Sequence, residues 1–162
     1  MNPLRCRLAC GFTLIELLVV MAVLGVLAAA VMPLGETLMR AQKERELRQA
    51  LWEIRGAIDE YKRMSQARTV AVAEGQSGYP ASLAALVEGV PDTRPQTQGQ
   101  MLYFLRRVPR DPFADPWLAA EKTWRLRSFA SPPDKPLPGD DVYDVRSSSD
   151  AVALDGSPYA TW

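Results

Sequence analysis

An uncharged stretch of 18 residues, from Leu17 to Leu34, most constrains what this chain can fold into. With the residues just before it, the apolar run extends back to Phe12, and as a helix it is about 34 Å long. That length is enough to cross a hydrocarbon core of about 30 Å. Glu16 lies near the start of the run. A carboxylate inside a membrane segment is costly and usually marks a function, so the stretch predicts a membrane-spanning helix with a functional acid.

The charges around the run favour one orientation in the membrane. Arg5 and Arg7 precede it, and the next basic residue is Arg40. Positive charge before the run predicts a cytoplasmic N-terminus and an exported C-terminal domain. A secretory signal peptide cleaved near residues 28–30 is one interpretation, and a permanent single-span anchor is another. The anchor explains the hydrophobicity, but it leaves the acid at the start of the run unexplained.

The composition argues against several classes of function. The chain has 19 basic and 19 acidic residues, so a balanced charge speaks against a nucleic-acid partner. It has no histidine, the commonest general base and metal ligand. Its two cysteines, Cys6 and Cys10, both precede Gly11, so a chain cut after Gly11 has no thiol. Because no nucleophile and base are evident, we expect no catalytic residues, and a membrane-anchored periplasmic enzyme is the least favoured alternative.

Beyond the membrane run, the pattern predicts a helix that continues through residues 35–68. Apolar residues recur at spacings of three and four, which is one stripe along a helix. The opposite face is charged. We expect the stripe to pack on the chain's own globular domain, and a coiled-coil seam is the alternative. The residues of the stripe are Leu47, Leu51, Ile54, Ile58 and Tyr61.

The last part of the chain, residues 69–162, reads as a small α+β domain. Ser82 is suited to cap a short helix that ends at Gly89. Residues 124–129 and 141–145 alternate apolar and polar side chains, which predicts two strands. We expect loops at residues 90–100, 131–139 and 147–162, and either a helical turn or a strand at residues 101–108.

The junction before the apolar run resembles a known processing signal. Residues 11–17, Gly-Phe-Thr-Leu-Ile-Glu-Leu, resemble the class III signal of type IV pilins and type II secretion pseudopilins. The resemblance implies that a prepilin peptidase cuts between Gly11 and Phe12 and that Phe12 is then N-methylated. It also implies a helix break at Gly25 and Pro33.

The same resemblance gives the acid a role. Glu16 falls at the fifth position of the processed chain, where it is expected to face the N-terminal amine of a neighbouring subunit during assembly. An unpaired charge in lipid is much costlier than a paired one. A glutamate that only reaches towards the lipid headgroups is the alternative.

The globular half is similar to the major pseudopilin of type II secretion, chiefly over residues 79–117. In the turn-rich block, residues 110–117, Phe113 and Ala114 stand where that family carries tryptophan and glycine, while Pro116 keeps its place. The resemblance implies a pilin-like α+β fold, with a long N-terminal transmembrane and amphipathic helix packed on a small antiparallel β-sheet domain. It divides the chain into a leader (1–11), a filament-core helix (12–34), an amphipathic continuation (35–68) and a periplasmic domain (69–162).

The C-terminal loop departs from that family. Major pseudopilins usually bind calcium there, and here Asp150 and Asp155 are the weak calcium candidates, with serines at 147–149 in place of acidic and glycine residues. A solvated serine-rich loop without metal is the favoured interpretation. Type IV pilins often close this region with a disulfide, which a chain cut after Gly11 cannot form.

The resemblance implies a structural subunit of a periplasmic pseudopilus in a type II secretion system. Its expected partners are copies of itself, minor pseudopilins, the prepilin peptidase, the inner-membrane secretion platform, and membrane lipid before assembly. Its expected location is the bacterial inner membrane, single-pass, with a cytoplasmic N-terminus and a periplasmic C-terminal domain. A type IV pilin-like subunit for adhesion, motility or DNA uptake is the alternative.

Overall fold

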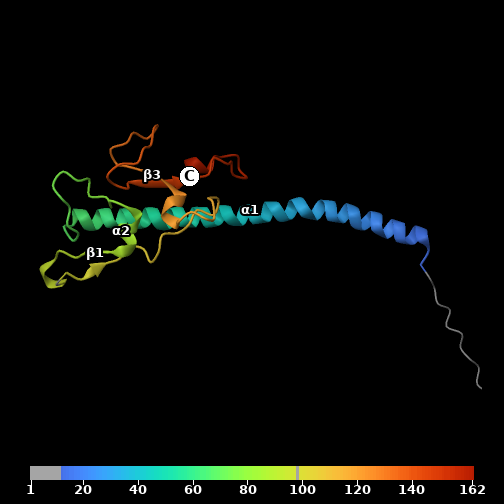
Figure 1. Cartoon of the computed structure of the whole chain (residues 1–162), viewed down its shortest axis with the longest axis horizontal. Helices are drawn as coiled ribbons and strands as arrows, with labels where there is room; N and C mark the ends of the chain where they lie inside the picture. Colours follow the sequence, from blue (N-terminus) through green and yellow to red (C-terminus); the bar gives the residue numbers. More distant parts are fainter. Residues whose placement is uncertain (1–11, 98) are drawn as a thin grey trace, which may run out of the picture. The chain divides into compact units, whose positions relative to one another are not determined.

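The computed structural model describes residues 12–97 and 99–162, and for residues 30–33 it describes only the backbone. The chain divides into two compact units, residues 1–40 and 41–162. One helix, α1 (Leu14–Gln66), contributes to both units, while the short helix, the sheets and the 3-10 turns all belong to the second (Figure 1). The described elements are those of an α+β fold, as the sequence predicts.

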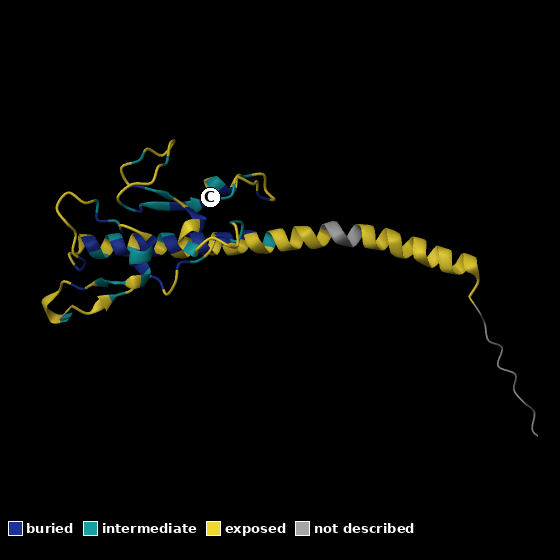
Figure 2. Cartoon of the chain, in the orientation of Figure 1, coloured by how far each residue is buried: buried dark blue, intermediate teal, exposed yellow. Residues whose placement is uncertain are grey.

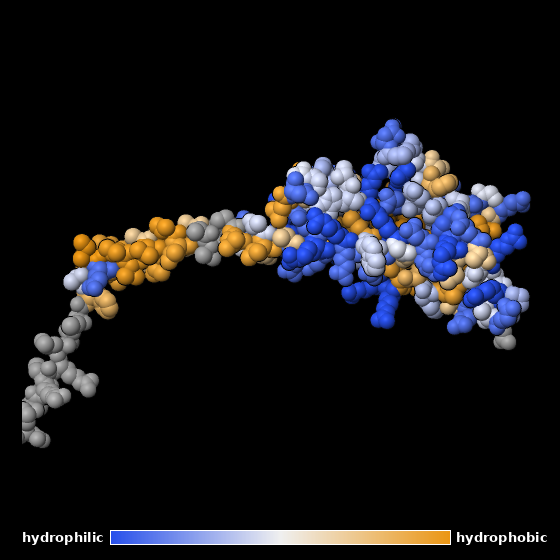
Figure 3. All heavy atoms as spheres, turned by 180° about the vertical axis from the view of Figure 1, so that it is seen from behind, coloured by the Kyte–Doolittle hydropathy of each residue, from blue (hydrophilic) through white to orange (hydrophobic). Residues whose placement is uncertain are grey.

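The part of α1 in the first unit is exposed on every side. All described side chains from residue 12 to residue 40 are exposed (Figure 2). Most of these side chains are apolar, so the exposed surface of this stretch is hydrophobic (Figure 3). A helix that is apolar all round is stable in lipid or inside a bundle, because it has no polar face for water.

The part of α1 in the second unit buries one face. The predicted stripe is confirmed, because its five residues are all buried in the core of this unit. Burial recurs every three or four residues from the forties to the mid-sixties, as expected of an amphipathic helix. The buried residues of this part are Glu44, Leu47, Ala50, Leu51, Ile54, Ala57, Ile58, Tyr61 and Ser65.

The helix ends two residues earlier than predicted, at Gln66 rather than 68. Arg68 has a positive φ of 56°. Its N–H donates to Ser65 O at 3.0 Å, and Thr69 N–H donates to Met64 O at 2.9 Å. This pair of bonds is a Schellman motif, which satisfies the last carbonyls of the helix and turns the chain back.

The short helix α2 (Leu83–Glu88) is confirmed with its predicted ends. The Ser82 side chain accepts a hydrogen bond from Ala85 N at 3.2 Å, and Gly89 follows with a φ of 83°. After it, the predicted loop at residues 90–100 is partly wrong. This stretch contains strand β1 (Val90–Pro91) and the 3-10 turn η1 (Pro95–Thr97), and β1 pairs antiparallel with β2 (Met101–Leu102).

The second sheet pairs β3 (Trp124–Arg127) with β4 (Asp144–Ser147) in antiparallel register. The first strand begins at the predicted residue and ends two residues earlier than predicted, and the second lies a few residues later than predicted. Tyr143 N–H already donates to Arg127 O, but Val142 N–H donates outside this sheet, to Pro80 O. The ladder therefore begins at Asp144, because the backbone before Tyr143 is used to hold the α2 region.

The C-terminal segment, residues 147–162, is not only the predicted polar loop, because it contains a 3-10 turn and a buried aromatic residue. It ends in the 3-10 turn η3 (Tyr159–Thr161), and Tyr159 is fully buried. The Tyr159 ring stacks on Phe113 with a centroid distance of 4.2 Å, and Trp162 contacts it edge-on. Val152 and Leu154 stay exposed. Tyr159 thereby belongs to the core cluster, and Trp162 packs against it. A further 3-10 turn, η2 (Ala120–Thr123), leads into β3.

Candidate functional site

The predicted processing junction, Gly11–Phe12, lies at the beginning of the described residues. Gly11 lies outside the described residues, and Phe12 is exposed and precedes α1. The helix begins at Leu14, so Glu16 lies in its first turn. Among the described residues, only Phe12 and Thr13 precede the helix.

Glu16 and Thr13 form a capping box. The Thr13 hydroxyl accepts a hydrogen bond from Glu16 N at 3.3 Å. In return, a Glu16 carboxylate oxygen accepts from Thr13 N at 3.3 Å and from the Thr13 hydroxyl at 3.4 Å. Such reciprocal bonds satisfy donors that the first helical turn leaves open. The signal was present in the sequence as Thr-x-x-Glu, and it gives Glu16 a local role that was not predicted.

The predicted helix break at Gly25 and Pro33 is not found in this chain. Helix α1 continues through both positions. No neighbouring atom lies within 4 Å of the place that a Cβ at Gly25 would occupy. Proline removes one helical hydrogen bond, and a long helix on both sides tolerates that loss. A break that forms only on assembly stays a prediction.

Each of the two calcium candidates is engaged by the protein itself. Asp150 pairs with Arg125 of β3 at 2.9 Å, and this hydrogen bond lowers the pKa of the carboxyl below its usual value. Asp155 accepts from the Ser157 hydroxyl at 2.6 Å and from Ser157 N at 2.9 Å, and these bonds lower its pKa. Both carboxylates therefore have partners within the protein that favour their ionised form.

The surrounding residues do not fit a calcium site. Calcium takes six to eight oxygen ligands, most of them carboxylates and carbonyls. Within the part of the chain that the structure describes, no group of three or more acidic, histidine or cysteine side chains could hold a metal. The hydroxyl of Ser147 donates to Asp111 at 2.6 Å, and that of Ser149 accepts from Ala151 N. These hydroxyls are thus already used inside the fold.

Asp111 is a structural residue that the sequence did not reveal. It lies in the turn-rich block and is fully buried. Besides Ser147, its carboxylate accepts from Phe113 N at 2.8 Å and from Ser148 N at 3.2 Å. A buried carboxylate needs such donors, because an unpaired charge is costly in the interior. Asp111 thereby ties the turn-rich block to the end of β4.

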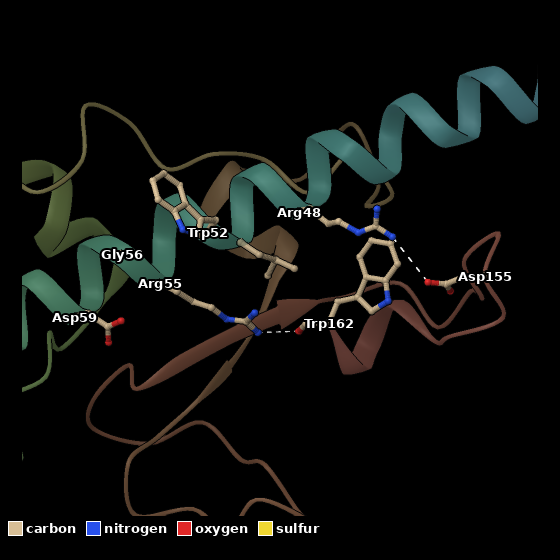
Figure 4. A pocket seen from close by; sticks show the side chains of 8 residues that line it. Arg48, Trp52, Arg55, Gly56, Asp59, Asp155 and Trp162 are labelled. Atoms are coloured by element: carbon tan, nitrogen blue, oxygen red, sulfur yellow. Dashed lines mark hydrogen bonds and ion pairs between the residues drawn. The ribbon is translucent and has the colours of Figure 1, made fainter.

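A groove of about 490 Å³ lies along α1 in the second unit (Figure 4). Trp52 lines it and is 79% exposed. Gly56 also lines it, and neither a close neighbour nor a positive φ requires glycine there. The lining has aromatic and charged side chains but no nucleophile with an adjacent base, so it is suited to contacts rather than to chemistry. The groove is lined by Arg48, Leu51, Trp52, Arg55, Gly56, Asp59, Asp155 and Trp162.

Comparison with known protein families gives a match at the N-terminal end of the sequence. Residues 6–32 match the prokaryotic N-terminal methylation motif. The motif indicates a type IV pilin-like subunit. The match includes the Gly11–Phe12 junction, Glu16 and Gly25, and it ends one residue before Pro33. No curated protein and no solved structure matches the chain.

This motif implies processing by a prepilin peptidase and pilus-like polymerisation. Proteins with this motif are structural rather than enzymatic. By length and composition, α1 includes a stretch that could cross a membrane. Together with the motif, this apolar helix fits membrane anchoring.

Proposed function

We propose that the chain is a pseudopilin, which polymerises into a periplasmic pseudopilus and drives protein export by a type II secretion system. The observation that carries the proposal is the methylation motif at the head of α1, whose first part is apolar and exposed on all sides. Two sequence features favour secretion over an adhesive or motile pilus. They are the similarity of residues 79–117 to major pseudopilins and the absence of a thiol after Gly11.

Before assembly, the apolar part of α1 lies in inner-membrane lipid, with the N-terminus in the cytoplasm and the second unit in the periplasm. The prepilin peptidase cuts after Gly11 and methylates Phe12. The new amine at Phe12 then lies four residues before Glu16. Since an acid paired with a cation is much less costly in an apolar medium, pairing with the amine of a neighbouring subunit selects one register of docking.

The capping box supports this role. Among the described residues, the Glu16 carboxylate accepts hydrogen bonds from two donors of its own helix terminus, the N–H and the hydroxyl of Thr13. These contacts are 3.3–3.4 Å long and exposed, so they hold the acid at the helix start and are easily exchanged. The carboxylate is thus stored at the position where a neighbour's amine would meet it.

The filament would then be a bundle of apolar helices with the second units outside. Its other partners would be minor pseudopilins and the inner-membrane secretion platform. Packing against neighbouring helices replaces the lipid around each apolar helix, so assembly keeps the apolar surface of this helix out of water. No nucleic-acid contact is part of this function.

The test is a clean deletion of the gene in its host, complemented with the wild-type gene or with Glu16→Ala. We expect exported proteins to disappear from the medium and to accumulate in cells, with rescue by the wild-type gene only. Motility and DNA uptake are measured alongside. Normal export with lost motility or uptake would assign the subunit to a type IV pilus instead, and no change in any of these would refute both assignments.

A further inference from the structure

Glu44 is a buried acid that the N-terminal motif does not explain. It lies on α1 in the second unit and is only 5% exposed. One carboxylate oxygen accepts hydrogen bonds from Leu154 N at 2.8 Å and from the Tyr159 hydroxyl at 2.9 Å. Both donors belong to the C-terminal segment. Because a buried charge is costly without partners, Glu44 and this segment depend on each other.

Two arginines on the same helix hold the rest of the segment. The guanidinium of Arg48 stacks on the Trp162 ring, 4.2 Å from its centroid (Figure 4). Arg55 donates to the Trp162 carbonyl oxygen at 2.7 Å and to Val145 O at 3.0 Å. The segment is therefore attached to α1 at the Leu154 backbone, at the Tyr159 hydroxyl and at Trp162.

The beginning of the segment is held by a second buried acid. Asp111 accepts from the Ser147 hydroxyl and from Ser148 N, as described above. Two buried carboxylates from outside the segment thus collect its backbone and hydroxyl donors. A bound calcium ion would do the reverse, since it collects carboxylate and carbonyl oxygens rather than N–H and hydroxyl donors.

We propose that Glu44 organises the C-terminal segment in place of a bound calcium ion, so that this subunit folds and keeps its surface without calcium. Glu44 is a positioning residue, and its charge is what matters, because a carboxylate accepts stronger hydrogen bonds than a neutral group. The proposal concerns the folded subunit, and it stands or fails independently of the proposed function.

The test is hydrogen exchange, followed by mass spectrometry, on the processed full-length subunit in detergent. The peptide that contains Leu154 reports the bond to Glu44 directly. We expect excess calcium and excess EGTA to give the same exchange in the wild type. Glu44→Gln should raise exchange of this peptide about tenfold, since it weakens charge-assisted bonds. Glu53→Gln, an exposed acid on the same helix, is the matched control and should change nothing.

A second variant covers the case in which Glu44→Gln does not fold. Tyr159→Phe keeps the ring stacked on Phe113 and removes only the hydroxyl that bonds to Glu44. It should fold and raise exchange of the same peptide by a few-fold. Three results would overturn the proposal: protection that EGTA abolishes in the wild type, calcium that restores protection in the Glu44→Gln variant, or wild-type exchange in both variants.

Discussion

The two parts of α1 carry similar apolar residues in opposite surroundings. Ile15, in the first unit, is 70% exposed, whereas Ile54, in the second, is fully buried. The first part is apolar on all faces, while the second has an apolar stripe and a charged opposite face. One continuous helix thus has a sequence suited to two different environments. Its second part obtains stability from its own domain, and its first part must obtain it from lipid or from other subunits.

The largest effect is expected from a substitution that blocks cleavage just before the apolar first part of α1. Gly11→Leu places a bulky side chain at the cleavage junction, so we expect no processing and no filament. Gel mobility and mass spectrometry of the N-terminus measure the cleavage. Ala9→Leu, two residues before the junction, is the control and should be processed. Normal cleavage of the Gly11 variant would refute the prediction that the chain is cut after Gly11.

A matched pair of substitutions tests the comparison itself. Ile54→Ala should lower the unfolding free energy of the second unit by about 2–5 kcal/mol, because it opens a cavity in the core. Ile15→Ala, the same change in the same helix, should alter it by less than about 0.5 kcal/mol. Urea unfolding of the full chain in detergent, followed by tryptophan fluorescence, gives both values. Equal losses would show that the two parts do not differ as described.

Glu16→Ala tests the assembly role of the first part. We expect normal cleavage and membrane insertion, but a loss of filament of about tenfold or more, since the amine of the neighbour is left unpaired. Filament yield after shearing is the measurement. Thr13→Ala separates the two roles of the acid, because it removes only part of the capping box. Normal yield from the Glu16 variant would contradict the pairing.

Gly56→Ala tests whether the second part is optimised for its own domain. The position is helical and has room for a methyl group. Alanine should therefore raise the stability of the second unit by about 0.5–1 kcal/mol, because glycine loses more backbone entropy on folding. Thermal unfolding measures the gain. A loss of stability would mean that the groove beside Trp52 is tighter than the structure indicates.

The smallest effect appears only in acid. Burial opposes the charge of Asp141, but hydrogen bonds from Ser128, Ser77 and Phe129 N outweigh it, so its pKa lies below the usual value. A lowered folded-state pKa contributes stability above the unfolded value, and this is lost as pH falls through the folded value. The second unit should weaken below about pH 4.

Asp141→Asn should flatten that pH dependence. Urea unfolding midpoints between pH 3 and pH 7 measure it, with the exposed Asp134→Asn as the control. An unchanged slope in acid would show that Asp141 contributes nothing to it.

Local patterns in the sequence predicted a large share of the fold. The sequence predicted the stripe on α1, the Ser82 cap, the Gly89 end of α2 and the start of the strand at Trp124, because each depends on neighbours within one turn or one strand. The strand at 90–91 was missed because two residues have no periodicity. The end of α1 was missed because Arg68 takes a conformation that usually belongs to glycine.

For the candidate site too, local features could be predicted from the sequence, and long-range contacts could not. The methylation motif is contiguous, so the sequence by itself determined the motif around Gly11 and Phe12 and the apolar helix behind it. Only the tertiary structure decided what Glu44 and Asp111 do. Glu44 meets Tyr159 across 115 positions of the chain, and Asp111 meets Ser147 across 36. The physical reason is that a buried carboxylate is defined by its donors, and no local pattern records donors so distant in the sequence.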